Sequence, residues 1–292
     1  MRAFLSLLAA CLVLPGAAHA ETGTGRAGFA EVNQISLRYQ LAGHGPRTIV
    51  LLHELGTSME SWDEVVGDLA ADNRVLRYDL RGFGLSEKLR GAVTFEDEVE
   101  DLRGLLDHLG ITGPVTLVGS AVGGAVALRF AAAYPQRAAA VMALSPAGDV
   151  PAAARAPYLA RAAKQERLGM RADVDASLDG YYPPVLRPGH EDRLARFRAI
   201  QYANDPVSMA ATLRMIAITD WAATWPAIKC PVWFVAVKHY YARPVKAVEA
   251  MAGLVAQGHF AALDTGPFVP IQSPELLKPM LNDFLKATAG EP

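Results

Sequence analysis

The sequence predicts an α/β fold in which helices flank a mostly parallel, eight-stranded sheet, with a helical lid inserted after the sixth strand. Short β-rich apolar runs alternate with helix-length segments, which is typical of a parallel sheet covered on both faces. One such run, within residues 114–128, passes through a glycine cluster directly into an Ala-rich helix. Residues 149–225 contain helical segments only. We therefore expect the core over residues 21–148 and 226–292 and the lid over residues 149–225.

The first twenty residues have the pattern of a secretory signal peptide. Arg2 is followed by an apolar stretch over residues 4–14 and by an A-x-A cleavage site that ends at Ala20. We expect cleavage after Ala20 and an exported protein, periplasmic or secreted, with no membrane attachment afterwards. The apolar stretch is shorter than the roughly 18 residues of a membrane span. A lipid anchor on Cys11 is a weaker alternative, because apolar residues continue beyond it.

Composition argues against some kinds of partner and leaves the oligomeric state open. A net charge of −2 and a pI of about 6.4 give no sign of a nucleic-acid partner. Removal of the signal peptide would leave Cys230 without a disulfide partner, and it is expected to be a buried apolar residue. The histidines and cysteines show no metal-ligand spacing, so we expect neither a metal nor a cofactor.

The predicted elements follow one another in a regular order. Alternating apolar positions and bounded β-rich runs predict strands, and amphipathic or Ala-rich stretches predict helices. Strands are expected at residues 28–42 (two strands), 48–52, 74–78, 139–144, 231–237 and 260–264, and another in the run that begins near Pro114 and leads into the glycine cluster. Helices are expected from about Ser58, over 95–109, from Val122 to about Tyr134, over 243–254 and over 274–286. Functional residues are expected at the carboxyl ends of the strands.

The glycine cluster resembles the nucleophile elbow of α/β-hydrolases, in which small residues flank a nucleophile on a strained turn. The flanking glycines are Gly119 and Gly123, and the residue between them is Ala121. Ser120 lies one position too early for the glycine spacing. The methyl group of Ala121 can neither attack a carbonyl group nor transfer a proton.

Four other stretches strengthen this resemblance. The loop over residues 79–86 looks like the D-x-R-G-x-G-x-S loop of α/β-hydrolases, whose Asp79 and Arg81 are expected to brace loops. Residues 53–62, 202–206 and 272–276 look like segments of the 3-oxoadipate enol-lactonase branch and the related aminoacrylate hydrolases. The resemblance implies the α/β-hydrolase fold and a nucleophile, an acid and a histidine in that chain order.

The resemblance also locates the acid and histidine positions, and both are substituted. The run that matches the acid motif G-x-x-D ends in Tyr240, and the loop that usually carries the histidine has Pro267. A standard Ser-His-Asp triad is therefore not expected. His259 spells the expected histidine motif, but it precedes the predicted strand, about 20 Å from the catalytic edge.

A further difference lies in the loop after residues 48–52, which usually reads H-G and helps to form the oxyanion hole with the N–H of Val122. Here His53 is followed by Glu54, whose carboxyl group could donate a proton if burial raised its pKa. Glu54 and Tyr240 are the candidates for a rebuilt catalytic site, while loop bracing by His53 and a pocket wall at Tyr240 are the structural alternatives. The predicted ligand pocket consists of His53, Glu54, Ala121, Val122, His239, Tyr240 and Pro267.

Two functions fit these residues, and a third fits less well. The first is a small-molecule-binding pseudohydrolase. The second is an enzyme that uses Glu54 and Tyr240, with or without His53 or His239, for acid/base chemistry on a small lactone, enol or carboxylic acid, without a covalent intermediate. The third keeps hydrolysis through a displaced set: Ser120 or Ser145 with Asp149 or Asp264. An arginine of the lid could additionally hold a substrate carboxylate, although most lid arginines are expected to be solvated.

Overall fold

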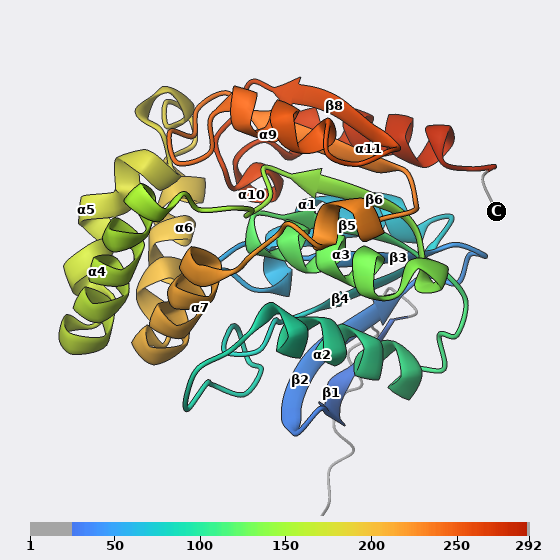
Figure 1. Ribbon diagram of the computed structural model, residues 1–292, viewed down its shortest axis with the longest axis horizontal. Coiled ribbons are helices and arrows are strands. Elements are labelled where there is room, and N and C mark those ends of the chain that lie inside the picture. Colours follow the sequence, from blue (N-terminus) through green and yellow to red (C-terminus); the bar gives the residue numbers. More distant parts are fainter. Residues whose placement is uncertain (1–24, 291–292) are drawn as a thin grey trace, which may run out of the picture.

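The computed structural model describes residues 25–290, and it has the predicted eight-stranded sheet (Figure 1). The strand order is β1-β2-β4-β3-β5-β6-β7-β8; β1 and β2 pair antiparallel, as do β2 and β4, and all other pairs are parallel. The strands are β1 (Arg26–Val32), β2 (Ile35–Ala42), β3 (Thr48–Leu52), β4 (Arg74–Tyr78), β5 (Val115–Ser120), β6 (Ala138–Leu144), β7 (Val232–Val237) and β8 (Gly258–Leu263). The expected signal peptide and its cleavage site lie outside the described residues.

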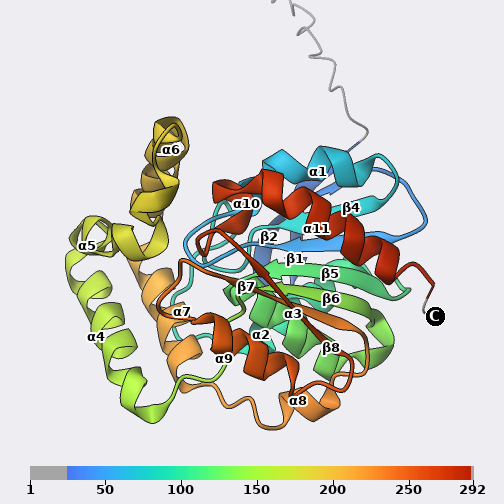
Figure 2. The same ribbon diagram turned by 90° about the horizontal axis from the view of Figure 1, so that it is seen from above.

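Helices cover both faces of the sheet. One face packs against α1 (Asp63–Ala70) and α11 (Pro274–Ala287), which bury Val65 and Phe284 against it. The other face packs against α2 (Phe95–His108), α3 (Val122–Ala133) and α9 (Val245–Ala252). Figure 2 shows these two groups on opposite sides of the strands. Every residue of β3 and β5 is buried, as expected for central strands of a parallel sheet with two covered faces.

The chain between β6 and β7 is helical, and it holds α4 (Ala152–Leu168), α5 (Arg171–Tyr181), α6 (Glu191–Ala203), α7 (Pro206–Ile218) and α8 (Thr224–Ala227). Figures 1 and 2 show α4 to α7 grouped beside one end of the sheet. Helices α4 and α7 pack on each other through Ala162, Ala210 and Leu213, whose small or compact side chains allow close contact. This group therefore stands next to the strand ends where β5 turns into α3.

Three predicted elements differ from the structure in detail. The helix expected near Ser58 is a 3₁₀ turn (η1, Met59–Trp62) followed by α1, and α9 is shorter than the expected span of 243–254 because Pro244 begins it and Gly253 ends it. His259 does not precede β8 but lies inside it, paired with Trp233 of β7. Its ring packs on Trp233 at a centroid distance of 4.5 Å, which provides a structural role for it.

Short 3₁₀ and helical turns complete the fold: η2 (Pro135–Arg137), η3 (Pro184–Leu186) and α10 (Val269–Gln272). Within residues 25–290, no helix is both long and apolar enough to cross a bilayer. The same part of the chain contains no group of three or more His, Cys, Asp or Glu side chains that could hold a metal ion. Cys230 is buried, and burial raises the pKa of its thiol to about 11.

Candidate functional site

The turn between β5 and α3 has the strained geometry of an elbow, with alanine at its apex. Ala121 has φ 48° and ψ −110°, a conformation that residues with a Cβ rarely adopt. A Cβ on Gly119 would clash with the carbonyl oxygen of Gly123, and a Cβ on Gly123 would clash with that of Leu52. These two glycines let strand, turn and helix approach one another. The backbone of the turn therefore has the form of an elbow, with a methyl group where a nucleophile would be.

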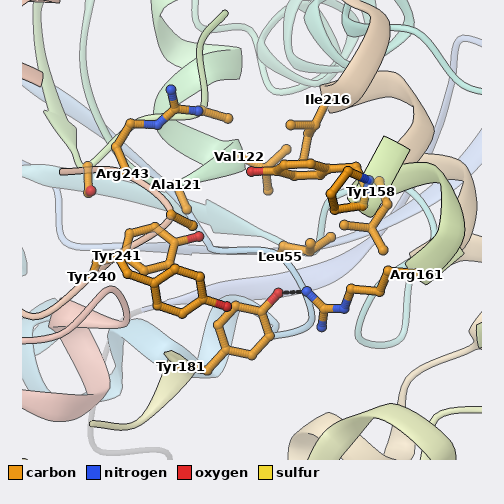
Figure 3. Close-up of a pocket in the computed structure, with 15 residues that line it drawn as sticks. Leu55, Ala121, Val122, Tyr158, Arg161, Tyr181, Ile216, Tyr240, Tyr241 and Arg243 are labelled. Atoms are coloured by element: carbon orange, nitrogen blue, oxygen red, sulfur yellow. Dashed lines mark hydrogen bonds between the residues drawn. The ribbon is translucent and has the colours of Figure 1, made fainter. Parts of the chain in front are cut away.

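Ala121 faces a cavity of about 200 Å³ between the elbow and the helices that follow β6 (Figure 3). The apolar part of its wall includes Leu55, Val122, Leu213 and Ile216. The polar and aromatic lining residues are Ser145, Tyr158, Arg161, Tyr181, Tyr240, Tyr241 and Arg243. Neither a histidine nor a carboxylate side chain belongs to the lining, so the cavity itself offers no ordinary general base.

Two backbone N–H groups beside the cavity, one in the loop after β3 and one at the elbow, have no acceptor in the described part of the protein. Leu55 and Val122 both line the cavity, and neither N–H donates to a protein acceptor within residues 25–290. Val122 is the first residue of α3, where the N–H has no partner inside the helix and the helix dipole favours negative charge. The N–H groups of Leu55 and Val122 are therefore two potential donors for a ligand oxygen, and the serine that usually accompanies such donors is absent from position 121.

Of the three substituted triad positions, two reach the cavity. Ala121 lies at its floor and Tyr240 forms part of its wall, where burial raises the pKa of the Tyr240 phenol above its ordinary value. Pro267 is buried but does not line the cavity, contrary to the predicted pocket. The adjacent Gly266 packs against Pro183 and Leu186, and these two residues therefore cover the loop that carries Pro267.

His53 braces two loops and does not line the cavity, so its place in the predicted pocket is corrected. Its Nδ1 lies 2.8 Å from the carbonyl oxygen of Glu54, and the backbone N–H of Leu80 donates to its Nε2 at 2.9 Å. This pattern assigns the proton to Nδ1. The ring is fully buried beside Phe83, and burial lowers the pKa of His53. A neutral imidazole thus holds the loop after β3 to the loop after β4.

Glu54 also lies outside the cavity, which corrects a third pocket assignment. Its side chain is 0% exposed, and its Oε2 accepts a hydrogen bond from Thr57 Oγ1 at 3.0 Å, whereas Oε1 has no partner. Burial raises its pKa to about 7, against the opposing effect of neighbouring hydroxyl groups that include Ser61 and Ser120. The carboxyl group points neither to the cavity nor to a surface arginine. It occupies a sealed space beneath the elbow.

His239 is the fourth predicted pocket residue that lies outside the cavity, because it lies at the surface. Its Nε2 is 2.7 Å from Asp264 Oδ1, and Lys238 Nζ lies 3.4 Å from the other oxygen of the same carboxylate. Such a partly exposed pair contributes little to stability. Among the residues predicted to form the pocket, the structure brings together Ala121, Val122 and Tyr240 in one cavity.

The displaced serine set does not assemble either. Ser120 is fully buried next to Glu54 and does not line the cavity. Ser145 does line it, in a strained conformation with φ 41°, and its buried Oγ has no hydrogen-bond partner. No histidine lies in the same wall to accept the proton of this hydroxyl. Asp264 instead pairs with His239, and Asp149 contributes its backbone carbonyl to Arg243.

The cavity wall contains Arg161, one of the lid arginines considered from the sequence, and Arg243, which the sequence pattern did not reveal. Arg243 lines the cavity from the segment between β7 and α9, three residues after the acid position. Arg161 approaches from α4 and hydrogen-bonds the Tyr181 hydroxyl, as Figure 3 shows. An arginine immediately before Pro244 at the start of a helix was the signal that could have identified Arg243.

Asp79 and Arg81, expected to brace loops, do so through different partners. The Asp79 carboxylate accepts hydrogen bonds from the backbone N–H groups of Met59 and Leu85 and contacts Arg38. Arg81 forms a two-pronged contact with Asp101 of α2. These contacts fix the loops on both sides of His53, and neither residue lines the cavity.

Comparisons with known proteins agree with the α/β-hydrolase fold. A family model described as alpha/beta hydrolase fold matches residues 47–213. A relative from Variovorax paradoxus, described as putative carbamate hydrolase RutD, is 31% identical over 202 residues, which cover 67% of this chain and 75% of the relative. The structure is similar to the enol-lactonase from Burkholderia xenovorans LB400, with a TM-score of 0.84 and 28% identity over 89% of this chain and 100% of that one.

Other relatives are similar over shorter segments. The dihydrolipoyllysine-residue acetyltransferase component of the acetoin cleaving system of Pseudomonas putida is 38% identical over 120 residues, or 41% of this chain. The matched segment is 32% of that relative, so the chain spans about a third of the length of the first curated relatives that it matches.

Proposed function

Because the chain belongs to the alpha/beta hydrolase fold family, we propose that it retains the family's pocket as a binding site for a small molecule and does not perform Ser-His-Asp hydrolysis. The observation that carries this proposal is Ala121 at the apex of a strained elbow, facing a cavity without a histidine or a carboxylate in its wall. Loss of nucleophile and base together removes the covalent route, because these groups act as a unit. The remaining parts, a cavity and two free N–H groups, are those of a receptor.

The alternative is acid/base catalysis by Glu54 and Tyr240, and the structure gives it less support. The two side chains do not meet, since Tyr240 lines the cavity and Glu54 is sealed beneath the elbow. A general acid or base must come within hydrogen-bond reach of the substrate. Tyr240 alone could donate a hydrogen bond, and burial raises its pKa, which keeps it protonated at neutral pH.

The proposal includes two features predicted from the sequence. Residues 149–225 act as a lid over the cavity, a role supported by the lining residues Tyr158, Arg161 and Leu213 that this segment supplies. The protein is exported through the signal peptide of residues 1–20, so the ligand is met outside the cytoplasm.

An ester and lactone panel tests the function. The purified protein is assayed with p-nitrophenyl acetate and enol-lactones beside the Glu54→Gln variant. We expect product formation at the buffer rate with both proteins. Turnover by the native protein that disappears in Glu54→Gln would refute the binding role and support the acid/base alternative. Turnover that survives in Glu54→Gln would also refute the binding role, and it would make Tyr240 and Ser145 the candidate catalytic residues.

A further inference from the structure

Arg243 is a buried cation without an anionic partner. It is 8% exposed, and one of its terminal nitrogens donates to the carbonyl oxygen of Asp149 at 3.3 Å. No carboxylate within residues 25–290 lies within 4.0 Å of its guanidinium nitrogens. A buried charge is costly unless it is paired and hydrogen-bonded. Because Arg243 lines the cavity, a ligand that enters it can supply the missing negative charge.

The second arginine of the cavity is already neutralised. Arg161 donates from two nitrogens to Asp173 of α5, at 2.7 Å in each case, and Gln165 donates to the same carboxylate oxygen at 2.8 Å. The lining thus carries two guanidinium groups, and only that of Arg243 is free of a carboxylate. This leaves one uncompensated positive charge in the wall of the cavity, and it selects a ligand with a single negative charge.

The residue at position 240 explains why the charge of Arg243 is uncompensated. Tyr240 and Arg243 line the same cavity, and the positive charge of Arg243 acts on the Tyr240 phenol. An aspartate at position 240 would place a carboxylate beside the guanidinium. Tyrosine at that position leaves Arg243 available to a ligand and adds an aromatic surface next to it.

The remainder of the cavity fits a flat apolar body. Tyr158 and Tyr240 lie on opposite sides of the cavity in Figure 3, and Leu213 and Ile216 add apolar surface from α7. Aromatic rings pack favourably edge-to-face or offset against a ligand ring. An apolar cavity of about 150 Å³ accommodates benzene. A cavity of about 200 Å³ therefore has room for a benzene ring and a carboxylate group.

We propose that the cavity binds an aromatic monocarboxylate, with the carboxylate on Arg243 and the ring between Tyr158 and Tyr240. The planar guanidinium presents paired N–H donors that match the two oxygens of a carboxylate. The buried hydroxyl of Ser145, which has no protein partner, lies in the same wall and can donate a further hydrogen bond. This inference rests on the proposed binding function and names its ligand class.

Calorimetric titration with benzoate and benzamide tests the charge requirement on the native protein. The two molecules have nearly the same shape and differ in charge. We expect benzoate to bind roughly tenfold or more tightly than benzamide, because a hydrogen bond to a charged group is worth about 1.5–3 kcal/mol. Equal affinities for the two molecules, or no binding of benzoate at millimolar concentration, would overturn the proposal.

Two variants and a control assign the effect to Arg243. Arg243→Gln should lower benzoate affinity roughly tenfold or more and leave benzamide affinity unchanged. Tyr240→Asp retains Arg243 but gives it an internal carboxylate, so benzoate affinity should fall in this variant too. Arg155→Gln removes an exposed arginine that lies outside the cavity and should change neither affinity. Unchanged benzoate binding in Arg243→Gln would contradict the assignment, and thermal unfolding of each variant reports whether it is folded.

The same preparations separate this inference from the proposed function. If p-nitrophenyl acetate is turned over while benzoate is preferred to benzamide, the ligand class stands and the absence of catalysis is refuted. If no ester is hydrolysed and the protein binds benzoate no more tightly than benzamide, the binding role stands and the ligand class is refuted.

Discussion

Thr57 donates a hydrogen bond to the Glu54 carboxyl group, from Oγ1 to Oε2 at 3.0 Å, while the other carboxyl oxygen has no partner. The pair lies in the loop after β3, and both side chains are buried. An ionised carboxylate in this place would lack the contacts that compensate for lost hydration. The loop is therefore most stable when Glu54 carries its proton.

The first prediction concerns the pH dependence of stability in Glu54→Gln. Burial raises the pKa of Glu54 from 4.5 to about 7, so between these pH values the folded protein keeps a proton that the unfolded chain releases. The native protein should therefore lose stability relative to Glu54→Gln as the pH rises from about 4.5 to about 7, by roughly 3 kcal/mol in total. Urea unfolding of both proteins across this interval measures the difference.

Glu60→Gln provides the control with the opposite sign. Burial opposes ionisation of Glu60, but hydrogen bonds from Ser58 and Arg38 prevail and lower its pKa. Glu60 therefore stabilises the fold above its unfolded pKa, and this contribution is lost as the pH falls. A stability difference between the native protein and Glu54→Gln that does not change with pH would show that Glu54 is not a buried proton carrier.

The second prediction concerns the strain at the elbow. Ala121 holds φ 48°, and glycine adopts positive φ without a Cβ penalty, so Ala121→Gly should raise the free energy of unfolding by about 1 kcal/mol. The matched control is Ala163→Gly in the exposed face of α4, which should lower it by about 1 kcal/mol. Denaturant unfolding measures both. A destabilised Ala121→Gly variant would mean that the methyl group packs in the cavity floor more strongly than the turn is strained.

The third prediction concerns restoration of the elbow serine alone. Ala121→Ser places a hydroxyl group at the apex of the turn, but no histidine or carboxylate lines the cavity to take its proton. We expect no burst of p-nitrophenol from p-nitrophenyl acetate and a steady rate equal to that of the native protein. A burst stoichiometric with protein would reveal a base that reaches the cavity by a movement of the surrounding loops.

The fourth prediction concerns the ion pair that joins α4 and α5. Asp173→Asn removes the carboxylate that compensates Arg161, and the loss of charged hydrogen bonds should cost about 1–3 kcal/mol of stability. The comparison variant Asp175→Asn breaks the exposed pair with Arg198, and its unfolding curve should overlay that of the native protein. Equal effects of the two substitutions would indicate that the Arg161 pair is solvated.

Local sequence sufficed for the sheet and for the elbow. The strands β3 and β4 have the predicted bounds, because each is a short run, apolar in most of its residues, between turn-forming residues. The spacing of Gly119 and Gly123 predicted the position of the strained turn, since any side chain at these two residues would strike backbone. The strand pattern and the glycine spacing are readable from short stretches of sequence, although Gly123 owes its requirement to the carbonyl group of the distant Leu52.

The cavity wall could not be predicted in the same way. His53 and Glu54 follow a buried strand at the edge of the sheet where the site is expected, yet both side chains point into the protein. The backbone N–H of Leu80 holds His53 there, and the Thr57 hydroxyl holds Glu54. Arg243 reaches the cavity from the segment before α9, and Tyr158 reaches it from α4. Their meeting depends on how the helices after β6 pack, and no short-range pattern encodes that packing.

The ring of Tyr241 borders the cavity and is 79% exposed. It rests against Gly180 in α5, where a Cβ would approach the ring to 2.5 Å. So little packing leaves the ring free to swing on the timescale of exposed side chains, nanoseconds or faster. The residence time of the ligand and its affinity can therefore be changed separately. A smaller side chain at Tyr241 would speed both entry and exit of the ligand, while the groups deeper in the cavity would still determine the dissociation constant.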